Sequence, residues 1–454
     1  MNKLELLKNR RAEVLASGKK IREKIAELTD ENSFAEFDSY SFSANEFYDG
    51  NVGGEGVVTG VATVNDNSVY IVAQNAEVLS GGVTEANCRK IVKCQEKALR
   101  AGSPIIYLLD SRGVSVGEGI GALEGIAEVL SAVHDLKGEV PQFAVTVGEL
   151  YGSFALVAAS CDYNFVVKGG AVSYASPKVI AASCGKKCEG GCQSSSLTTF
   201  EAENIASVRD TVAKILDCLP EYNGDVETMD DYNRTAPELN EKACEKCVID
   251  AVFDKDYFIE MNKGFAPEVV TGIGRIGGMA CAAIVFGGAD DGVELDGDII
   301  AKIKDFVYYC DENSFPLVTF VNAAGIKATA GVACTPVVKQ AANLAYALNN
   351  LDTPRLNVIY KNAIGLGYTL FGSKALGADY SYAFATAKVS LFDTKKGAMI
   401  ELAGVNEENH DKAEAKYAEE TQDPFNAAKK GCVDDIIEPQ FVRQYIISAL
   451  QRLC

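Results

Sequence analysis

The chain has 454 residues, of which 48% are hydrophobic and 23% charged, a composition typical of a folded protein with more than one domain. Its net charge of −20 argues against nucleic acid as a partner, because phosphate binding requires a basic surface. The sequence shows neither a run of about 18 apolar residues nor a secretory signal, so we expect a cytoplasmic protein with reduced thiols.

The N-terminal segment, residues 1–48, is basic within an acidic chain. Residues 3–24 carry eight bases and three acids. We expect a helical segment whose charges face solvent. The alternative is contact with an anionic group, such as a nucleotide phosphate or an acidic partner.

Residues 56–110 predict a β-hairpin, an amphipathic helix and a buried strand. Apolar residues alternate on both sides of a turn at Asn65-Asp66-Asn67. The helix begins after Thr84, a favourable N-cap, and ends at Gly102. The strand 105–110 follows, and then a Gly-containing loop and another helix. Alternating helices and buried strands predict a parallel α/β architecture, in which ligands bind where strands meet helix N-termini.

The second half of the chain repeats this order. The tetrapeptide VVTG occurs at 57–60 and again at 269–272, an offset of 212 residues. Further matches at this offset, or one residue more, pair a strand and two glycines: 103–110 with 315–322, Gly113 with Gly325, and Gly152 with Gly365. The second hairpin turns at Gly277-Gly278, and the second helix begins near Asp296 or Asp298. The repeat predicts two copies of one domain, at 49–237 and 238–454.

Two short motifs carry little weight. Gly272-x-Gly274-x-x-Gly277 matches the dinucleotide fingerprint but lies inside a predicted hairpin, so it does not indicate a nicotinamide cofactor. His134 lies in a helical pattern and His410 in an acidic, loop-like segment, and neither has a nucleophile nearby in sequence. Backbone dipoles or a carried cofactor are therefore favoured over histidine chemistry.

Two groups of cysteines could supply metal ligands. Cys184, Cys188 and Cys192 have a spacing that fits no standard pairing, whereas Cys244 and Cys247 have the spacing of half a zinc ribbon. The helical sequence around the second group favours small buried thiols. We therefore expect no metal site.

Long segments in this order resemble the carboxyltransferase family of biotin-dependent acyl-CoA carboxylases and decarboxylases. The resemblance runs from about residue 31 to the C-terminus and includes GEGVVTGVATV, LLDSRGVSVGEGIGALEG, VIDAVFDKDYFIEMNKGFAPEVVTGIGRIGG and GCVDDIIEPQFVRQYIISAL. It implies an α/β fold of tandem duplicated crotonase-like (ClpP/crotonase) ββα superhelix domains. It also implies a homo-oligomer, from dimer to hexamer, with each active site between the first domain of one subunit and the second domain of its partner.

The resemblance places an oxyanion hole, made of backbone N–H groups, in each domain. The acyl-CoA carbonyl would lie against Gly152 and Ser153, and the biotin ureido oxygen against Leu366 and Gly367. The residues carried over as substrate-binding are Ser111, Gly113, Gly325 and Gly365, of which Gly365 shapes the second turn. The alternative is that the glycines only permit close packing of helix against strand.

This chain departs from the family pattern at several of these positions. The family reads DSGGAR and DVPGF where this chain has Asp110–Ser115 and Asn322–Ile326. The family also has a Gly-Gly pair at both holes, where this chain has Gly152-Ser153 and Gly365-Leu366. Phe154 and Leu366 add bulk beside the expected sites. The acyl substrate is therefore open, and an inactive scaffold is one alternative.

The resemblance also implies a cofactor and partners. Biotin would arrive on a separate biotin carboxyl carrier protein, because the chain has no Met-Lys-Met biotinylation motif. A biotin carboxylase or membrane decarboxylase subunits would complete the system. The expected activity is transfer of a carboxyl group between biotin and an acyl-CoA of the malonyl-, methylmalonyl- or glutaconyl-CoA type. The reverse transfer by a decarboxylase α subunit is the second alternative, because one active site serves both directions.

Overall fold

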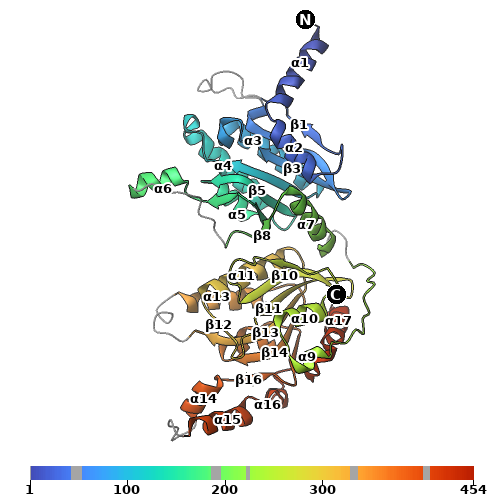
Figure 1. Cartoon of the computed structure of the whole chain (residues 1–454), viewed down its shortest axis with the longest axis vertical. Helices are drawn as coiled ribbons and strands as arrows, with labels where there is room; N and C mark the ends of the chain where they lie inside the picture. The colour runs from blue at the N-terminus through green and yellow to red at the C-terminus, as the bar shows by residue number, and fades with distance from the viewer. Residues whose placement is uncertain are drawn as a thin grey trace. The chain divides into compact units, whose positions relative to one another are not determined.

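The computed structural model describes residues 2–41, 54–185, 196–220, 225–327, 336–401 and 409–453. The chain forms two compact units, Met1–Lys214 and Ile215–Cys454, each with its own β-sheet (Figure 1). Segment 1–48 belongs to the first unit, and the expected boundary between residues 237 and 238 lies inside the second. Where the two functional halves divide stays a prediction. Within the described ranges, no helix has the length and apolar character needed to cross a bilayer.

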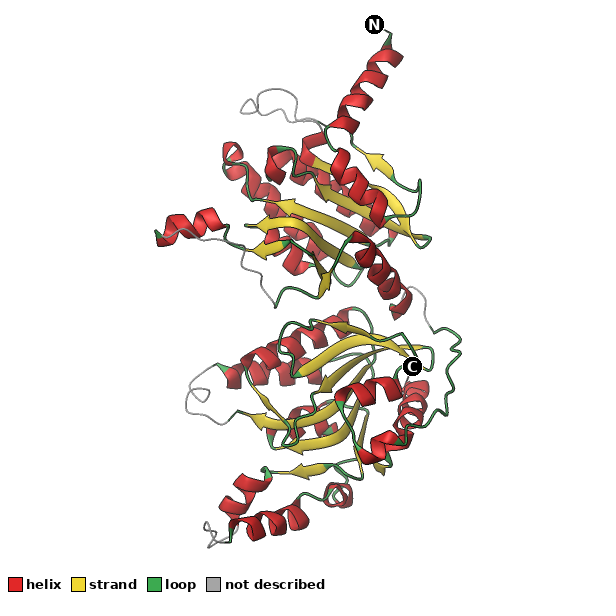
Figure 2. Cartoon of the chain, viewed as in Figure 1, coloured by secondary structure: helices red, strands yellow, loops and turns green. Residues whose placement is uncertain are grey.

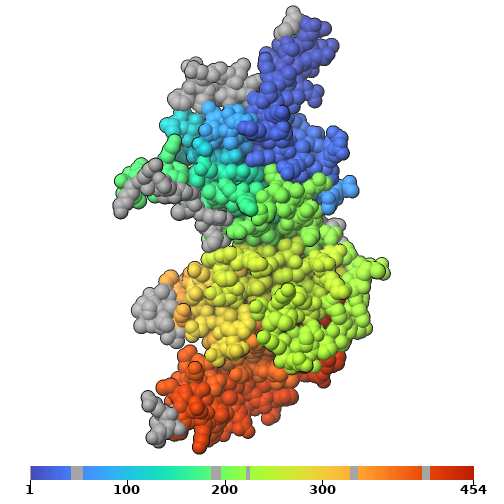
Figure 3. Space-filling view, in the orientation of Figure 1, coloured from blue at the N-terminus to red at the C-terminus, as the bar shows by residue number. Residues whose placement is uncertain are grey.

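The first unit begins with the two basic helices α1 (Lys3–Ala16) and α2 (Lys19–Leu28). Helix α1 buries only Val14, and it stands clear of the body of its unit (Figure 3). Helix α2 buries Ile21, Ile25 and Leu28, one face of the helix, against the hairpin of the first sheet. Most of the basic side chains expected to face solvent are exposed.

The first sheet has the order β1-β2-β3-β4-β5-β6-β8, with β7 also paired to β5. Its strands are drawn in yellow and the helices of the unit in red in Figure 2. Strands β1 to β3 pair antiparallel, and the remaining pairs are parallel. The strands are β1 (Ala35–Phe37), β2 (Val57–Val64), β3 (Asn67–Gln74), β4 (Ile105–Ser111), β5 (Gln142–Tyr151), β6 (Tyr163–Val167), β7 (Ala171–Ser173) and β8 (Phe200–Ala202). The remaining helices are α3 (Glu85–Ala101), α4 (Ile120–Leu136), α5 (Phe154–Ser160), α6 (Pro177–Cys184) and α7 (Ile205–Cys218).

The second sheet reproduces this order as β9-β10-β11-β13-β14-β15-β17, with β16 on β14 in the place of β7 on β5. Strand β12 pairs in addition with β13. The strands are β9 (Ile259–Met261), β10 (Val269–Ile276), β11 (Met279–Phe286), β12 (Val293–Leu295), β13 (Leu317–Ile326), β14 (Arg355–Ile364), β15 (Tyr380–Phe384), β16 (Lys388–Ser390) and β17 (Asp435–Ile437). The helices are α9 (Glu238–Glu241), α10 (Glu245–Val252), α11 (Gly297–Glu312), α13 (Val337–Asn349), α14 (Thr394–Glu401), α15 (His410–Thr421), α16 (Pro424–Lys429) and α17 (Val442–Leu453).

The strand registers show that the two sheets are copies. Val57 pairs with Gln74 in the first hairpin, and Val269 pairs with Phe286 in the second, a shift of 212 residues on both strands. The first parallel pairing, between the hairpin and the next strand, shifts by the same amount. The predicted duplication is therefore confirmed at the level of individual residue pairs.

Several local predictions can be compared with the structure. Helix α3 begins after Thr84, whose hydroxyl accepts the Asn87 N–H, and its C-cap is the left-handed Gly102, as predicted. The glycines of the dinucleotide-like motif lie in β10 and its turn, as expected. The loop predicted around His410 is wrong, because His410 opens α15 and its Nδ1 lies 2.9 Å from the Glu414 carboxylate.

A carboxylate holds the hairpin turn of the first unit. Asp30 accepts hydrogen bonds from the amides of Asn65 and Asp66 at 3.1 and 3.0 Å and pairs with Arg209 of α7 at 2.6 Å. Hydrogen bonds, the strongest from the Thr63 hydroxyl, hold the pKa of Asp30 below its usual value. The turn is thereby tied to the helix that ends the unit.

The second unit repeats this device in a more buried form. Asp254 accepts the amides of Gly277 and Gly278 at 3.0 and 2.8 Å and pairs with Arg443 of α17 at 2.6 Å. The side chains of this ion pair are only 3% and 1% exposed. Each unit thus closes on itself through one aspartate and one arginine.

A buried lysine also recurs in both units. Lys90 of α3 donates to the Val57 carbonyl at 2.6 Å, and Lys302 of α11 donates to the Val269 carbonyl at 2.7 Å. Lys302 makes three further bonds, to carbonyls in the segment 262–266. Burial lowers the pKa of each ammonium group to about 8. These lysines fix the start of each hairpin to the first helix of its sheet.

Candidate active site

Each unit ends a central strand in a glycine turn that opens a short helix. In the first unit, β5 is followed by Gly152, with a φ of +76°, and α5 then begins. In the second, β14 is followed by Gly365, with a φ of +51°, before the π-helix η4 (Tyr368–Gly372). A side chain rarely adopts such a φ, so glycine is required at both turns.

A second left-handed glycine lies opposite each turn. Gly113 has a φ of +112°, and a Cβ placed on Gly152 would lie 3.7 Å from the Cα of Gly113. Gly325 has a φ of +87°, and a Cβ placed there would lie 3.6 Å from the Leu366 amide nitrogen. The structure therefore brings the predicted site residues of each unit together.

An irregularity in each sheet produces these turns. Leu109 pairs with Thr146 in β4 and β5, but the next pair is Ser111 with Leu150, so β5 bulges. The sheet of the second unit has the same register shift between β13 and β14. The bulge re-aims the end of the strand, so that the turn faces the glycine of the neighbouring strand.

The turns present amide groups that no described residue uses. No acceptor among the described residues pairs with the N–H of Ser153, Leu366 or Gly367. The first amides of a helix lack intrahelical partners and carry the positive end of the helix dipole. Such groups suit an oxygen that gains negative charge.

The amide of Gly152, which was expected to face a ligand, is already engaged. Its N–H donates to the Tyr174 carbonyl oxygen at 2.9 Å, and the N–H of Gly365 likewise donates to Ser390 at 3.0 Å. These bonds extend the pairing of the short strands β7 and β16 with the ends of β5 and β14. Gly152 therefore shapes the turn, and Ser153 is the predicted donor that remains.

Ser111, expected to contact the substrate, lies in the interior instead. Its side chain is fully buried, and its hydroxyl oxygen accepts the Gly113 N–H at 3.3 Å. Ser111 therefore holds the loop that carries Gly113. Gly325, in the second unit, is buried as well and packs against the carbonyl of Ile364.

The two bulky residues beside the turns behave differently. Phe154 is 1% exposed and belongs to the hydrophobic core of the first unit, so its ring does not fill the site. Leu366 is half-buried at the turn itself. Gly367 is buried, and a Cβ on it would lie 2.6 Å from the Ala323 carbonyl oxygen. Close packing of backbone on backbone is thus one reason for Gly367, alongside its unused amide.

The family model described as "Carboxyl transferase domain" matches residues 13–453. The chain belongs to this family. Methylmalonyl-CoA decarboxylase subunit alpha of Veillonella parvula is 30% identical over 496 residues, covering 99% of this chain and 96% of the relative. The carboxyltransferase subunit of propionyl-CoA carboxylase from Haloferax mediterranei is 28% identical over 462 residues, covering 95% and 90%. The transcarboxylase 12S crystal structure, a hexamer with methylmalonyl-coenzyme A bound, matches with a TM-score of 0.91 and 25% identity, over 99% of this chain and 95% of that one.

These similarities confirm the carboxyltransferase family and the tandem crotonase-type fold predicted from the sequence. The matched structure and the family model both span the two units, so the likeness is not confined to one copy. The chain is a carboxyltransferase.

The sequence did not single out one pair of residues in this carboxyltransferase. The carboxylate of Asp110 accepts the Glu149 N–H inside the first bulge, and the Asn322 side-chain oxygen accepts the Asn362 N–H at 3.2 Å inside the second. Burial raises the pKa of Asp110. The available signal was the polar residue that ends each buried strand at the same offset, Asp110 in one copy and Asn322 in the other.

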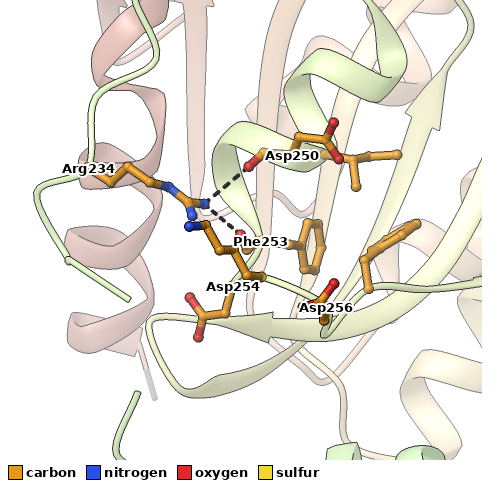
Figure 4. A pocket seen from close by; sticks show the side chains of 8 residues that line it. Arg234, Asp250, Phe253, Asp254 and Asp256 are labelled. Atoms are coloured by element: carbon orange, nitrogen blue, oxygen red, sulfur yellow. Dashed lines mark hydrogen bonds between the residues drawn. The ribbon is translucent and has the colours of Figure 1, made fainter. Parts of the chain in front are cut away.

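A pocket of about 490 Å³ lies in the second unit of the carboxyltransferase but contains none of the predicted site residues. Phe253 and Phe258 line it, together with Arg234, Asp250 and Asp256 (Figure 4). Arg234 is occupied by the carbonyls of Asp250 and Phe253, at 3.2 and 2.7 Å. This guanidinium therefore supports the end of α10 rather than a ligand.

The cysteines differ in part from the expectation of buried thiols. Cys244 and Cys247 form a disulfide at the start of α10. Cys184 is free and exposed, whereas Cys188 and Cys192 lie outside the described residues. In the described ranges, no three or more His, Cys, Asp or Glu side chains gather as a metal site. In this disulfide, the two sulfurs that have the spacing of half a zinc ribbon are bonded to each other.

Proposed function

We propose that this carboxyltransferase moves a carboxyl group between biotin on a carrier protein and an acyl-CoA of the malonyl-, methylmalonyl- or glutaconyl-CoA type. The observation that carries the proposal is the repeated turn, which in both units places backbone amides that no described residue uses opposite a left-handed glycine. Two ligands each need one such turn, because each has an oxygen that becomes more negative during transfer.

In the first unit, the Ser153 amide would stabilise the thioester oxygen as the acyl α-carbon loses its proton. Aligned amides at such a position contribute about 3 to 4 kcal/mol to a transition state. The Leu366 and Gly367 amides of the second unit would hold the ureido oxygen of biotin. Biotin, when bound, supplies or accepts the carboxyl group, and the chain orients it against the acyl-CoA. The described residues fit this division, because each turn has at least one backbone N–H that no described acceptor uses.

The direction of transfer is the same chemistry run either way. The relatives include both a decarboxylase subunit and a carboxylase subunit, so the proposal covers both directions of transfer. A non-catalytic scaffold is the second candidate, suggested by the missing Gly-Gly pairs. The inward orientation of Phe154 weighs against it, because the ring packs in the hydrophobic core of the first unit and does not cover the turn.

The proposed assembly is a homo-oligomer, from dimer to hexamer, served by a biotin carboxyl carrier protein. Large apolar side chains lie exposed in the segments that follow Gly113 and β7, as expected of a surface that a second subunit covers: Val116, Ile120, Tyr174 and Val179. A biotin carboxylase or membrane decarboxylase subunits would be the further partners. A cytoplasmic location belongs to the same proposal.

An assay with free biotin tests the activity. We expect biotin-dependent release of CO2 from malonyl-, methylmalonyl- or glutaconyl-CoA, and the preferred thioester would identify the acyl group. Tight binding of acyl-CoA without turnover would favour the scaffold. Absence of both binding and turnover with all three would refute the proposal.

Substitution at Ser153 tests the backbone donor. Ser153 has a φ of −65°, which proline adopts without strain, so Ser153→Pro removes the N–H while it keeps the turn. We expect kcat to fall by roughly 10²- to 10³-fold. Ser153→Ala is the matched control and should stay within about threefold of wild type, because it keeps the amide. Equal losses in the two variants would show that the side chain, and not the backbone, acts.

A further inference from the structure

The loop after β11 in the second unit is held by its carbonyl oxygens. All five consecutive carbonyls of residues 286–290 accept hydrogen bonds from side chains of β13 and β14. The donors are Tyr360 Oη to Phe286 and, at 3.4 Å, to Gly287, Asn322 Nδ2 to Gly287 at 2.6 Å and to Ala289 at 2.8 Å, Lys361 Nζ to Gly288 at 3.0 Å, and Asn362 Nδ2 to Asp290 at 2.9 Å. Such a complete set fixes the orientation of every peptide in the loop.

The same side chains form the bulge that aims the second turn. Tyr360, Lys361 and Asn362 lie where the register of β14 shifts, just before the Gly365 turn. Asn322 ends the regular part of β13, just before Gly325. The loop and the turn are therefore held by one group of residues.

The pair Asn322 and Asn362 joins the two strands. The Oδ1 of Asn322 accepts both the backbone N–H of Asn362 at 3.2 Å and its Nδ2 at 2.7 Å. Asn322 is fully buried, and Asn362 is 5% exposed. Beyond the loop, a Cβ on Gly292 would lie 3.1 Å from the amide nitrogen of Ala324, so the loop packs directly on the segment that carries Gly325. The asparagine pair thus couples the loop to the donor turn.

The first unit has only half of this arrangement. Asp110, at the position equivalent to Asn322, accepts the Glu149 N–H in its bulge. An ionised carboxylate has no N–H to donate, so it cannot bind loop carbonyls as an amide does. Carbonyl capture is therefore a property of the second unit, the one proposed to hold biotin.

We propose that Asn322 and Asn362 are positioning residues, which fix the 286–290 loop and the Leu366 turn relative to each other and so set the affinity for the biotin ring. The inference rests on the proposed function, because it assigns the second turn to biotin. Neither side chain needs to touch the ligand. Both act through the backbone that they hold.

Steady-state kinetics with free biotin tests the assignment. Asn322→Asp keeps the acceptor oxygen but places an oxygen against the Gly287 and Ala289 carbonyls, which makes the second unit resemble the first. We expect the KM for biotin to rise roughly tenfold or more, the equivalent of one or two lost hydrogen bonds, while the KM for acyl-CoA stays within about twofold. Asn362→Ala should act in the same direction. Asn350→Ala is the control, because its amide bonds only to its own helix, and it should change neither constant.

Hydrogen exchange separates the inference from the function that it rests on. In Asn322→Asp without ligands, the amides of residues 286–291 should exchange at least about tenfold faster, whereas β10 should stay protected. If wild type lacks turnover but the loop loosens in this way, the proposed function fails and the positioning role stands. Unchanged exchange, an unchanged KM for biotin, or an equal rise in both KM values would overturn the positioning role.

Discussion

Backbone angle, more than side-chain identity, defines the candidate site at the scale of single residues. Gly113, Gly152, Gly325 and Gly365 all lie in the left-handed region, and they shape turns whose candidate donors are the amides of a serine, a leucine and a glycine. A polar side chain then holds each bulge in place: a carboxylate in the first unit and a carboxamide in the second. Asp110 is the member of this pair whose charge can change with pH.

The substitution Asp110→Asn tests the cost of that buried charge. Burial raises the pKa of Asp110, so the folded state binds its proton more tightly than the unfolded chain does. The free energy of unfolding of wild type therefore falls as the pH rises from the ordinary aspartate range through the raised pKa. The amide keeps the bond to the Glu149 N–H and has no charge to bury.

We expect Asp110→Asn to be more stable than wild type at pH 7, with the difference shrinking as the pH falls towards the ordinary aspartate range. Denaturant unfolding of both proteins across this pH range measures the difference. A variant less stable than wild type at pH 7 would show that Lys24 and Arg112, the cations that favour the ionised form, outweigh burial.

Single residues were predictable where the backbone leaves a signature in the sequence. A left-handed turn after a buried strand requires glycine, so Gly152 and Gly365 could be found and matched between the halves. The hydrogen bond from the Gly152 N–H to the Tyr174 carbonyl could not be predicted, because it depends on the pairing of β7. That strand has three residues, too few to show an alternation of apolar and polar side chains. The burial of Ser111 depends on the same local packing.

At the scale of elements, each hairpin is fastened to the helix that follows it by one buried lysine. Lys302 reaches four carbonyls between residues 262 and 269 and is 5% exposed. The segment between β9 and β10 has little secondary structure of its own. Its order therefore depends on this ammonium group.

Replacing Lys302 with methionine should destabilise the second unit. The substitution keeps an apolar side chain of similar length but leaves several buried carbonyls without donors, so we expect the free energy of unfolding to fall by about 2 to 4 kcal/mol. Lys304→Met, on the same helix, is the control and should stay within about 0.5 kcal/mol of wild type. Denaturant unfolding followed by circular dichroism gives both values. A loss in the control as large as that in Lys302→Met would assign the effect to helix α11 in general.

Helices and strands were predictable where their sequence pattern is strong. Thr84 and Gly102 mark both ends of α3, and the alternation around the Asn65 turn marks the first hairpin. His410 was assigned to a loop, because the charged sequence around it lacks an apolar face, and α15 buries only Tyr417. Lys90 and Lys302 are separated by the offset of the repeat, but the sequence did not predict their burial, because a single lysine in a helix is usually a surface residue.

At the scale of the molecule, the duplication allows the same ion pair to be compared in two copies of one domain. The same aspartate–arginine pair closes each unit, yet the side chains of Asp30 and Arg209 are 23% and 32% exposed, whereas those of Asp254 and Arg443 are nearly inaccessible. Removing one partner of a buried pair leaves a charge without compensation, and removing one from a hydrated pair does not. The two copies should therefore respond differently to the same change.

We expect Arg443→Met to lower the free energy of unfolding by about 3 to 5 kcal/mol and Arg209→Met to lower it by about 1 kcal/mol or less. Chemical denaturation of the two variants beside wild type measures both. The two variants are compared with each other, because both arginines pair with the aspartate that holds a hairpin turn, whereas Arg443 is in addition buried and donates to the carbonyls of Asp231 and Val252. Similar losses in the two variants would mean that burial does not set the strength of the aspartate–arginine pair.

The repeat itself was predictable from the sequence, because strands and turns keep their spacing when side chains change. The boundary between the halves stays a prediction, because the described part of residues 215–237 contains no strand that would assign it to either sheet. The pairing of Cys244 with Cys247 also requires coordinates, because their spacing fits a metal, a disulfide or two free thiols equally well.

The main-chain character of the donors affects how such a protein evolves. The candidate site has serine in one half and leucine in the other, and both residues keep their N–H, so the side chains at these positions can change without removal of a donor. A score of active-site identity would undervalue a chain of this kind. The positions that cannot drift are the four left-handed glycines, and a search for distant functional relatives should weigh these above the donors themselves.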